Sequence, residues 1–187
     1  MICTLEDRKT MRYELIEGLY RMMDESGLQD DVYIDLNEDD GRETTGKKRN
    51  DLLQSSRAEF SVFIDDDDWV SSDYIERIVG TIRRNPGIDV IGFFGEVTFS
   101  CGTKRVMMHS LMCPQWTEDM SVYYRPPNHL NPVRTELAQR VQFKDITISE
   151  DHHWSVELSR QRILKNEVFL GGAPTYFYRC REPLKGL

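Results

Sequence analysis

The sequence predicts an α/β fold in which helices flank a mostly parallel central sheet, followed by a mixed C-terminal half. Short apolar strand patterns alternate with amphipathic helix patterns over residues 2–94. Such an alternation is typical of parallel strands joined by crossover helices. From residue 97 the pattern changes to a hairpin, two helix starts and two short strands. In a chain of 187 residues we expect one domain, 1–187, composed of the halves 1–95 and 96–187.

Each element of the first half has a local signal. Leu15 and Leu19 repeat at helical spacing and predict the buried face of a first helix, which Gly27 ends. Ser71 or Ser72 is expected to cap the third helix. The expected strands are 2–5, 32–36, 60–64 and 88–94, and the expected helices are 9–23, 46–56 and 72–82.

The second half predicts a hairpin and two capped helices. Cys101 and Gly102 separate two strand-like runs, as in a hairpin turn. Asn131 before Pro132 is typical of a helix start, and Ser149 is expected to cap a further helix. The expected strands are 97–100, 105–111, 121–125, 167–170 and 175–179, and the expected helices are 131–141 and a segment from 149 onward.

Composition argues against several classes of protein. The net charge of −8 disfavours long-range attraction to nucleic acid or to an anionic membrane. No apolar stretch approaches the roughly 20 residues that span a bilayer, and we expect no secretory leader. Four scattered cysteines without a CxxC pair fit a reduced protein better than a disulfide framework. We therefore expect a cytoplasmic protein without a membrane span.

Four consecutive aspartates, Asp65 to Asp68, directly follow the third expected strand. Because side chains alternate along a strand, Asp65 and Asp67 are expected on one side, roughly 6–7 Å apart. Two carboxylates at that distance repel by about 2–3 kcal/mol at an effective dielectric near 20, a cost that a bound cation removes. Mg²⁺ and Mn²⁺ are hard cations that carboxylates suit. The run therefore indicates a metal site, and a solvated acidic turn is the alternative.

Two other groups of charged residues lie at expected helix starts. Lys48 and Arg49 follow Gly46, where backbone N–H groups and basic side chains together attract an anion. Glu150 and Asp151 occupy a first helical turn, which favours the ionised carboxylate that a general base needs. The alternatives are an exposed basic turn and ordinary helix-start acids.

Taken in order, these motifs resemble those of nucleotide-sugar glycosyltransferases of family 2, which have the GT-A fold with a Rossmann-like central sheet. The likeness is greatest to the small stand-alone enzymes of phages and prophages. It covers nearly the whole chain, and the ordered set is much more specific than the aspartate run alone. The matching segments are 2–6, 39–41, 46–50, 65–68, 125–132 and 150–154.

The resemblance implies a role for individual residues. Asp151 would be the general base, and Asp67 with Asp65 would bind the metal. The nucleotide-binding residues that it implies are Thr4, Glu6, Arg8, Asp39, Gly46, Lys48, Arg49, Asn50, Asp65 and Asp66. The acceptor-binding residues that it implies are Glu150, Trp154, Asn128 and His129.

Three further side chains are left with open roles. Asp68 is expected to cap the turn that follows it. Trp154 would stack on a sugar or a base, and core packing is the alternative. Many proteins of this fold use a late histidine as an extra metal ligand, and no sequence rule chooses among His129, His152 and His153.

The implied reaction is a metal-dependent, inverting transfer of a sugar from a nucleotide-diphosphate sugar to an acceptor hydroxyl. A UDP-sugar is the expected donor, and Mn²⁺ or Mg²⁺ is the expected cofactor. The acceptor is left open among a glycan, a lipid-linked sugar, a protein and a hydroxymethylated base in phage DNA. A second subunit that completes the acceptor site is also left open.

Two alternative functions remain at this point. A nucleotidyltransferase of similar fold would carry a glycine-rich stretch directly after the first strand, where residues 6–9 are Glu-Asp-Arg-Lys. A non-catalytic module that binds a nucleotide sugar would tolerate the loss of Asp151.

Overall fold

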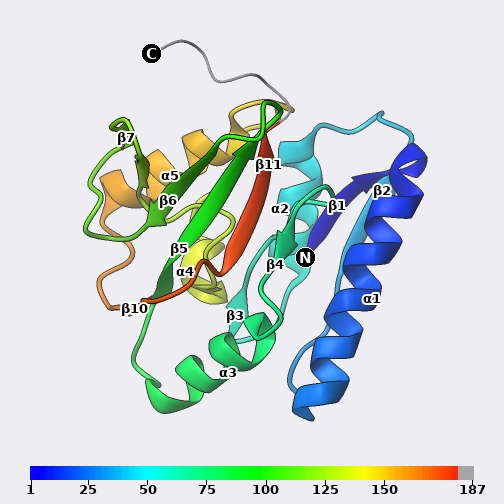
Figure 1. Cartoon of the computed structure of the whole chain (residues 1–187), viewed down its shortest axis with the longest axis horizontal. Helices are drawn as coiled ribbons and strands as arrows, with labels where there is room; N and C mark the ends of the chain where they lie inside the picture. The colour runs from blue at the N-terminus through cyan, green and yellow to red at the C-terminus, as the bar shows by residue number, and fades with distance from the viewer. Residues whose placement is uncertain (181–187) are drawn as a thin grey trace.

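A computed structural model describes residues 1–180 of the chain and has a mixed α/β fold (Figure 1). The strands are β1 (Ile2–Leu5), β2 (Leu36–Asp39), β3 (Phe60–Ser61), β4 (Trp69–Val70), β5 (Val90–Phe99), β6 (Lys104–His109), β7 (Thr117–Glu118), β8 (Val122–Arg125), β9 (Val133–Arg134), β10 (Glu167–Leu170) and β11 (Tyr176–Cys180). The helices are α1 (Lys9–Ser26), α2 (Thr45–Ser55), α3 (Tyr74–Arg84), α4 (Thr135–Ala138) and α5 (Glu150–Gln161), with a 3₁₀ turn, η1, at Glu6–Arg8.

Strand β5 is the centre of the larger sheet. One edge of β5 pairs with β10 and then with β11, both parallel, and the other edge pairs with β6 and β9, both antiparallel. Beyond β6 lie β8 and β7, and β9 continues to β3. Strands β1 and β2 form a separate parallel pair. The expected hairpin at Cys101 and Gly102 is confirmed, since it joins β5 to β6.

Residues 62–64 connect the two sheets. Met1 N donates to Val62 O over 2.9 Å, and Ile64 N donates to Met1 O over 3.1 Å, as in a parallel pair. On its other side, Phe63 N donates to His129 O over 2.9 Å. Asp65 therefore follows at the edge where β1 and β2 also end. This is the edge at which open α/β sheets bind their ligands.

Helices cover both faces of this framework, as the sequence predicts. Helices α1 and α3 contact each other and pack on the sheet in one apolar core, which includes Leu19, Ile78 and Phe93. Helices α2, α4 and α5 belong to a second core, which includes Leu53 and Leu158. Burial of these apolar side chains is the main force that holds the layers together.

Four of the expected strands differ from the structure. The segments 88–94 and 97–100 belong to one continuous strand, β5. The second strand is Leu36–Asp39 and not 32–36, because Val32 and Ile34 pack against the first core instead of pairing with β1. Of the segment 60–64, only Phe60–Ser61 forms a regular strand, paired with β9.

The expected helix over 131–141 is also wrong. Asn131 does not cap a helix, because its Oδ1 accepts from Asn128 N and its Nδ2 donates to Ile91 O, each over 2.9 Å. Residues Val133–Arg134 form β9 instead, and α4 is limited to Thr135–Ala138.

The expected helix caps are also observed only in part, because some capping residues bond to other groups. Thr44 caps α2, since its Oγ1 accepts from Lys47 N over 3.1 Å. Asp73 precedes α3, and Ser71 Oγ donates to its carboxylate over 2.6 Å, so the expected serine cap of α3 is wrong. Ser149 precedes α5 as expected, but its side chain makes no cap hydrogen bond.

Gly46 allows α2 to lie directly against the backbone of residues 144–146. Gly46 N donates to Ile146 O over 3.0 Å, and a Cβ added to Gly46 would lie 1.8 Å from Lys144 O. No side chain fits in that space, so glycine is required here for close approach.

We predict that Gly46→Ala lowers the free energy of unfolding by about 1–3 kcal/mol, because α2 and the backbone at Lys144 must separate. Gly18→Ala is the matched control, since Gly18 lies inside α1 with open space at its Cβ position. That substitution should raise stability by about 0.5–1 kcal/mol. Urea unfolding measures both values. A Gly46→Ala variant as stable as the wild type would contradict the close approach.

Candidate functional site

The four aspartates form a tight turn and not the end of a strand. Asp68 N donates to Asp65 O over 3.1 Å, which closes the turn. The expectation that Asp65 and Asp67 share one face of a strand is therefore wrong. Asp66 and Asp68 are buried, whereas Asp65 and Asp67 are only partly covered.

Asp66 fastens the turn to the end of β1. Its carboxylate accepts from Thr4 Oγ1 over 2.6 Å and from Arg8 Nη1 over 2.7 Å. Arg8 Nη1 also lies 3.9 Å from the Asp67 carboxylate. The structure thus brings together Thr4, Arg8 and Asp66 as expected, while the neighbouring Glu6 is exposed. Because Thr4 and Asp66 are buried and hydrogen-bonded to each other, they support the acidic turn from the protein interior.

Asp68 fastens the same turn to β11. Tyr176 Oη donates to its carboxylate over 2.8 Å, and Arg179 N donates to it over 2.9 Å. Tyr176 Oη also accepts from Asp65 N over 3.1 Å. Burial, followed by the charge of Asp65, raises the pKa of Asp68 to about 8. The expected role of Asp68 as a local cap is therefore wrong, because it bonds to the C-terminal strand.

Arg49 is a buried cation behind the turn. Its Nη2 donates to Asp65 Oδ1 over 2.9 Å, and its Nε lies 3.2 Å from Glu150 Oε1. Burial disfavours the charge of Asp65, but Arg49 and then His129 outweigh it and hold the pKa of Asp65 well below its usual range. Burial raises the pKa of Glu150, and Arg49 opposes that rise. Arg49 therefore joins the turn to α5 and does not present its charge to solvent.

Lys48 and Asp39 form a second ion pair, at the ends of β1 and β2. Lys48 Nζ also donates to Thr4 O over 2.8 Å. The hydrogen bond from Lys48 and that from Glu43 N lower the pKa of Asp39 to about 2. Lys48 and Asp39, two of the expected nucleotide-binding residues, therefore lie together with Thr4 at this edge.

Two expected ligand-binding residues have structural partners instead. Both amide atoms of Asn50 bond to the backbone of Phe143, each over 2.8 Å. Trp154 is 2% exposed, donates from Nε1 to Val141 O over 2.9 Å and stacks on Phe143 at 4.9 Å between ring centroids. Core packing, the alternative for Trp154, is therefore what the structure shows. Gly46 likewise contacts protein backbone, as described above.

Asp151 lies in the first turn of α5, and its side chain is 25% exposed. His129 stands between Asp151 and Asp65. Its Nδ1 lies 3.7 Å from Asp151 Oδ2, and its Nε2 lies 3.3 Å from Asp65 Oδ2. Asn128 is buried beside it and accepts from Leu130 N over 3.0 Å, which shapes this loop.

A cavity of about 450 Å³ opens in front of these groups. Ligand pockets in proteins commonly have volumes of about 300–1,000 Å³. Sequence reasoning found one wall of this cavity and missed the opposite one. The predicted residues on its lining are Arg49, Asp65, Asn128, His129, Glu150 and Asp151, and those that were not predicted include Met107, His109, Trp116, Tyr123, Arg125 and Tyr178.

The missed wall consists of an arginine between two aromatic rings. The Arg125 guanidinium lies 4.6 Å from the centroid of Trp116 and 4.9 Å from that of Tyr123. Burial lowers the pKa of Arg125. The only sequence signal for this wall is the matching segment that begins at Arg125, since nothing near Trp116 marks it as a site residue.

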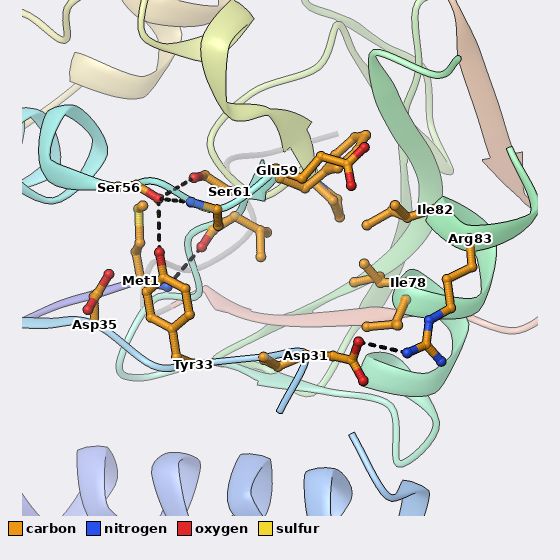
Figure 2. Close-up of a pocket in the computed structure, with 16 residues that line it drawn as sticks. Met1, Asp31, Tyr33, Asp35, Ser56, Glu59, Ser61, Ile78, Ile82 and Arg83 are labelled. Atoms are coloured by element: carbon orange, nitrogen blue, oxygen red, sulfur yellow. Dashed lines mark hydrogen bonds and ion pairs between the residues drawn. The ribbon is translucent and has the colours of Figure 1, made fainter. Parts of the chain in front are cut away.

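A second cavity, of about 360 Å³, lies at the opposite ends of β1 and β2 (Figure 2). Its polar side is a chain of hydroxyl contacts, in which Ser56 Oγ lies 3.4 Å from Tyr33 Oη and 3.3 Å from Ser61 Oγ. Arg83 bridges its rim to Asp31 over 2.7 Å. None of the predicted site residues lines it.

Comparison with known proteins decides the family. The sequence profile described as "Glycosyl transferase family 2" matches residues 29–162, which is more than half of the chain. The chain belongs to this family. A comparison of this family 2 chain with curated proteins found no match.

Solved structures of TarS from S. aureus have the same fold as this family 2 chain. The structure of TarS 1–349 in complex with UDP-GlcNAc superimposes with a TM-score of 0.63 at 14% identity, and covers 97% of this chain and 58% of TarS 1–349. The complex of TarS 1–349 with UDP gives a TM-score of 0.59 at 14% identity, with 96% and 60% of the two chains covered. The chain thus spans about three-fifths of the length of these relatives. The expected GT-A fold is confirmed.

The acidic turn of this family 2 chain fits a metal ion only in part. Within residues 1–180, no group of three or more His, Cys, Asp or Glu side chains is arranged to hold a metal ion. Both oxygens of Asp65 already face Arg49 or His129, whereas the Asp67 side chain is 22% exposed. Mg²⁺ is commonly held by one or two carboxylates, several waters and the phosphates of a substrate. An ion bound here would therefore depend on Asp67, and its other ligands would have to come from water or from a bound ligand.

Within the part of the chain that the structure describes, no helix is long and apolar enough to cross a bilayer.

Buried His109 makes the stability of this fold depend on pH. Burial lowers the pKa of His109 to about 4, and its ring stacks on Phe93 at 5.2 Å and contacts Asn131 over 3.2 Å. An unfolded histidine has a pKa near 6.5, so the unfolded chain binds a proton that the folded chain does not. Stability from this group is present above pH 6.5 and is lost as pH falls towards 4.

We predict that His109→Gln removes this loss. Relative to the variant, the wild type should lose about 3 kcal/mol of unfolding free energy between pH 7 and pH 4. Urea unfolding of both proteins across this pH range measures the difference. Parallel pH profiles would contradict the buried neutral state of His109.

Proposed function

We propose that this chain transfers a sugar from a UDP-sugar to an acceptor hydroxyl with inversion at the anomeric carbon, and that it uses a divalent cation. One observation carries the proposal. The acidic turn and the start of α5 lie far apart in the sequence, yet Asp65 and Asp151 line the same cavity and face the two nitrogens of His129. This arrangement supports Asp151 as a carboxylate base beside the edge where the donor is expected.

The donor is best accommodated along the ends of β1 and β2. Arg8, whose partly exposed guanidinium contacts Asp66 and Asp67, gives this edge a cation that suits the phosphates of a nucleotide. The TarS complexes with UDP-GlcNAc and UDP support a uridine nucleotide as the donor. The family supports glycosyl transfer over nucleotidyl transfer.

The general base is Asp151. The acceptor hydroxyl enters the cavity, Asp151 takes its proton, and the oxygen attacks the anomeric carbon from the side opposite the diphosphate. The bond from the anomeric carbon to the phosphate oxygen breaks, and UDP leaves. A divalent cation beside Asp67 supplies charge that stabilises the departing diphosphate when it is bound.

The acceptor that the cavity suits best is a glycan. Trp116 and Tyr123, with the Arg125 guanidinium between their rings, give the cavity an aromatic lining of the kind that sugars contact. Among the described residues that line it, the cations Arg49 and Arg125 are outnumbered by the carboxylates Asp65, Glu150 and Asp151. A nucleic acid carrying a hydroxymethylated base needs a basic groove for its phosphates, so the lining gives that acceptor less support.

We predict that Asp151→Asn lowers kcat by about 10²–10⁴-fold, because the acceptor hydroxyl loses its proton acceptor. The affinity for UDP-GlcNAc, measured by calorimetry, should stay within about twofold. UDP release across a panel of UDP-sugars and glycan acceptors measures the rate, and NMR of the product tests inversion. Glu157→Gln, an acid on the same helix that pairs with Arg160, is the control and should keep wild-type activity.

Two outcomes would count against glycosyl transfer by Asp151. Full activity in Asp151→Asn would show that another group accepts the proton or that the chain is a non-catalytic binding module. Pyrophosphate release from a nucleoside triphosphate, without UDP release from any donor, would support a nucleotidyltransferase instead.

We predict that Asp67→Asn weakens binding of UDP-GlcNAc by about tenfold or more in the presence of Mn²⁺, equal to a loss of about 1.4 kcal/mol or more. Without metal the variant and the wild type should bind alike, because the carboxylate acts through the cation. Asp73→Asn is the control, since Asp73 is an exposed acid that pairs with Arg77 on α3. Equal loss of affinity with and without Mn²⁺ would contradict a metal at Asp67.

A further inference from the structure

His129 occupies a place that no catalytic or donor-binding role explains. Its side chain lines the cavity but is only 5% exposed, so most of its ring surface faces protein. Its two ring nitrogens face two carboxylates on different elements, Asp65 on the acidic turn at 3.3 Å and Asp151 on α5 at 3.7 Å. A single rigid ring therefore fills the space between the turn and the base.

The loop that carries His129 is held in place by its own side chains. His129 O accepts from Phe63 N over 2.9 Å, two residues before Asp65. Asn128 Oδ1 accepts from Leu130 N, and Asn131 Oδ1 accepts from Asn128 N. Because the backbone is fixed to the same segment that leads into the acidic turn, the ring keeps a constant position relative to that turn.

The Nδ1 atom of His129 is buried, and within residues 1–180 it has no hydrogen-bond partner. Leaving a buried polar group without a hydrogen bond is unfavourable. Asp151 Oδ2 lies slightly beyond bonding distance and belongs to a partly exposed side chain, so a small rotation of that carboxylate would close the gap. Catalytic hydrogen bonds are often long without ligands and tighten when substrates bind.

We propose that His129 is a positioning residue that holds the Asp151 carboxylate at a fixed position relative to the acidic turn. Nε2 must carry a proton, because the Asp65 carboxylate can only accept, and Nδ1 must carry one as well to donate to Asp151, so the ring acts as an imidazolium with one donor for each carboxylate. The contact with Asp65 fixes the ring, and the ring then aims the Nδ1 proton at Asp151. This inference rests on the proposed function, since it assigns Asp151 as the base.

A role for His129 as a metal ligand has less support. The cation of Arg49 lies 2.9 Å from the same Asp65 carboxylate and would repel a divalent ion there. The other late histidines face different groups, since the ring centroid of His152 lies 4.7 Å from that of Trp116 and His153 Nε2 lies 3.4 Å from Lys144 Nζ.

Two amide substitutions test the two ring nitrogens of His129 separately. In His129→Asn the amide occupies the position of Nδ1 and can still meet Asp151. In His129→Gln the amide occupies the position of Nε2 and meets only Asp65. We expect His129→Gln to lower kcat by about 10–100-fold with the donor KM within about twofold, because a misplaced base costs rate and not donor binding. We expect His129→Asn to lose less than about fivefold in kcat.

The double variant gives the decisive comparison. In an Asp151→Asn background, His129→Gln should lower the remaining rate by less than about twofold, because the group that it positions is already lost. A purely structural histidine would cost the same factor in both backgrounds, and that result would overturn the proposal. Equal kcat values for His129→Asn and His129→Gln would overturn it as well.

A second measurement does not depend on turnover. The ring signal of His129 in a ¹H–¹³C NMR spectrum should move in Asp151→Asn and stay in place in Glu157→Gln. An unchanged signal in Asp151→Asn would overturn the coupling between ring and base. If the wild type turns over no UDP-sugar while the signal moves, the proposed reaction fails and the contact of His129 with Asp151 stands.

Discussion

The buried charge of Arg49 is the constraint on which the rest of the site depends. Taking a guanidinium out of water is costly unless carboxylates surround it with good geometry. Asp65 and Glu150 supply that compensation from the acidic turn and from α5, and the rings of Phe63 and Phe143 lie 5.2 Å and 5.8 Å from the guanidinium. One cation thus fixes the distance between the donor edge and the helix that carries Asp151.

The parts of the fold that could be predicted from sequence are those with local causes. Apolar residues at helical or strand spacing report which side of an element is buried, so the alternating first half and the hairpin between β5 and β6 are confirmed. The acids of the turn and of α5 stand at the ends of elements, where a polar run stops an apolar one. The positions of Asp65 and Asp151 at one cavity follow from that placement together with the family resemblance.

The residues whose roles could not be predicted are those whose partners come from distant segments. Lys48, Arg49 and Asn50 have side chains that suit phosphate, yet they bond to protein groups. Their partners are Thr4 O for Lys48, the Asp65 carboxylate for Arg49 and Phe143 O for Asn50. Asn131 has the sequence of a helix cap but bonds to the backbone of β5. Trp116 and Tyr123 reach the cavity only because β8 pairs with β6. None of these contacts can be inferred from the residues next to them in the sequence.

The attachment of the acidic turn to β11 has a consequence for synthesis of the chain. Asp68 and Tyr176 are separated by 108 positions, and Asp68 and Arg179 by 111. A nascent polypeptide that has passed the turn can already form its contacts with Thr4, Arg8 and Arg49, but not those of Asp68. The acidic turn therefore gains its full set of hydrogen bonds only after the last described strand, β11, has been synthesised.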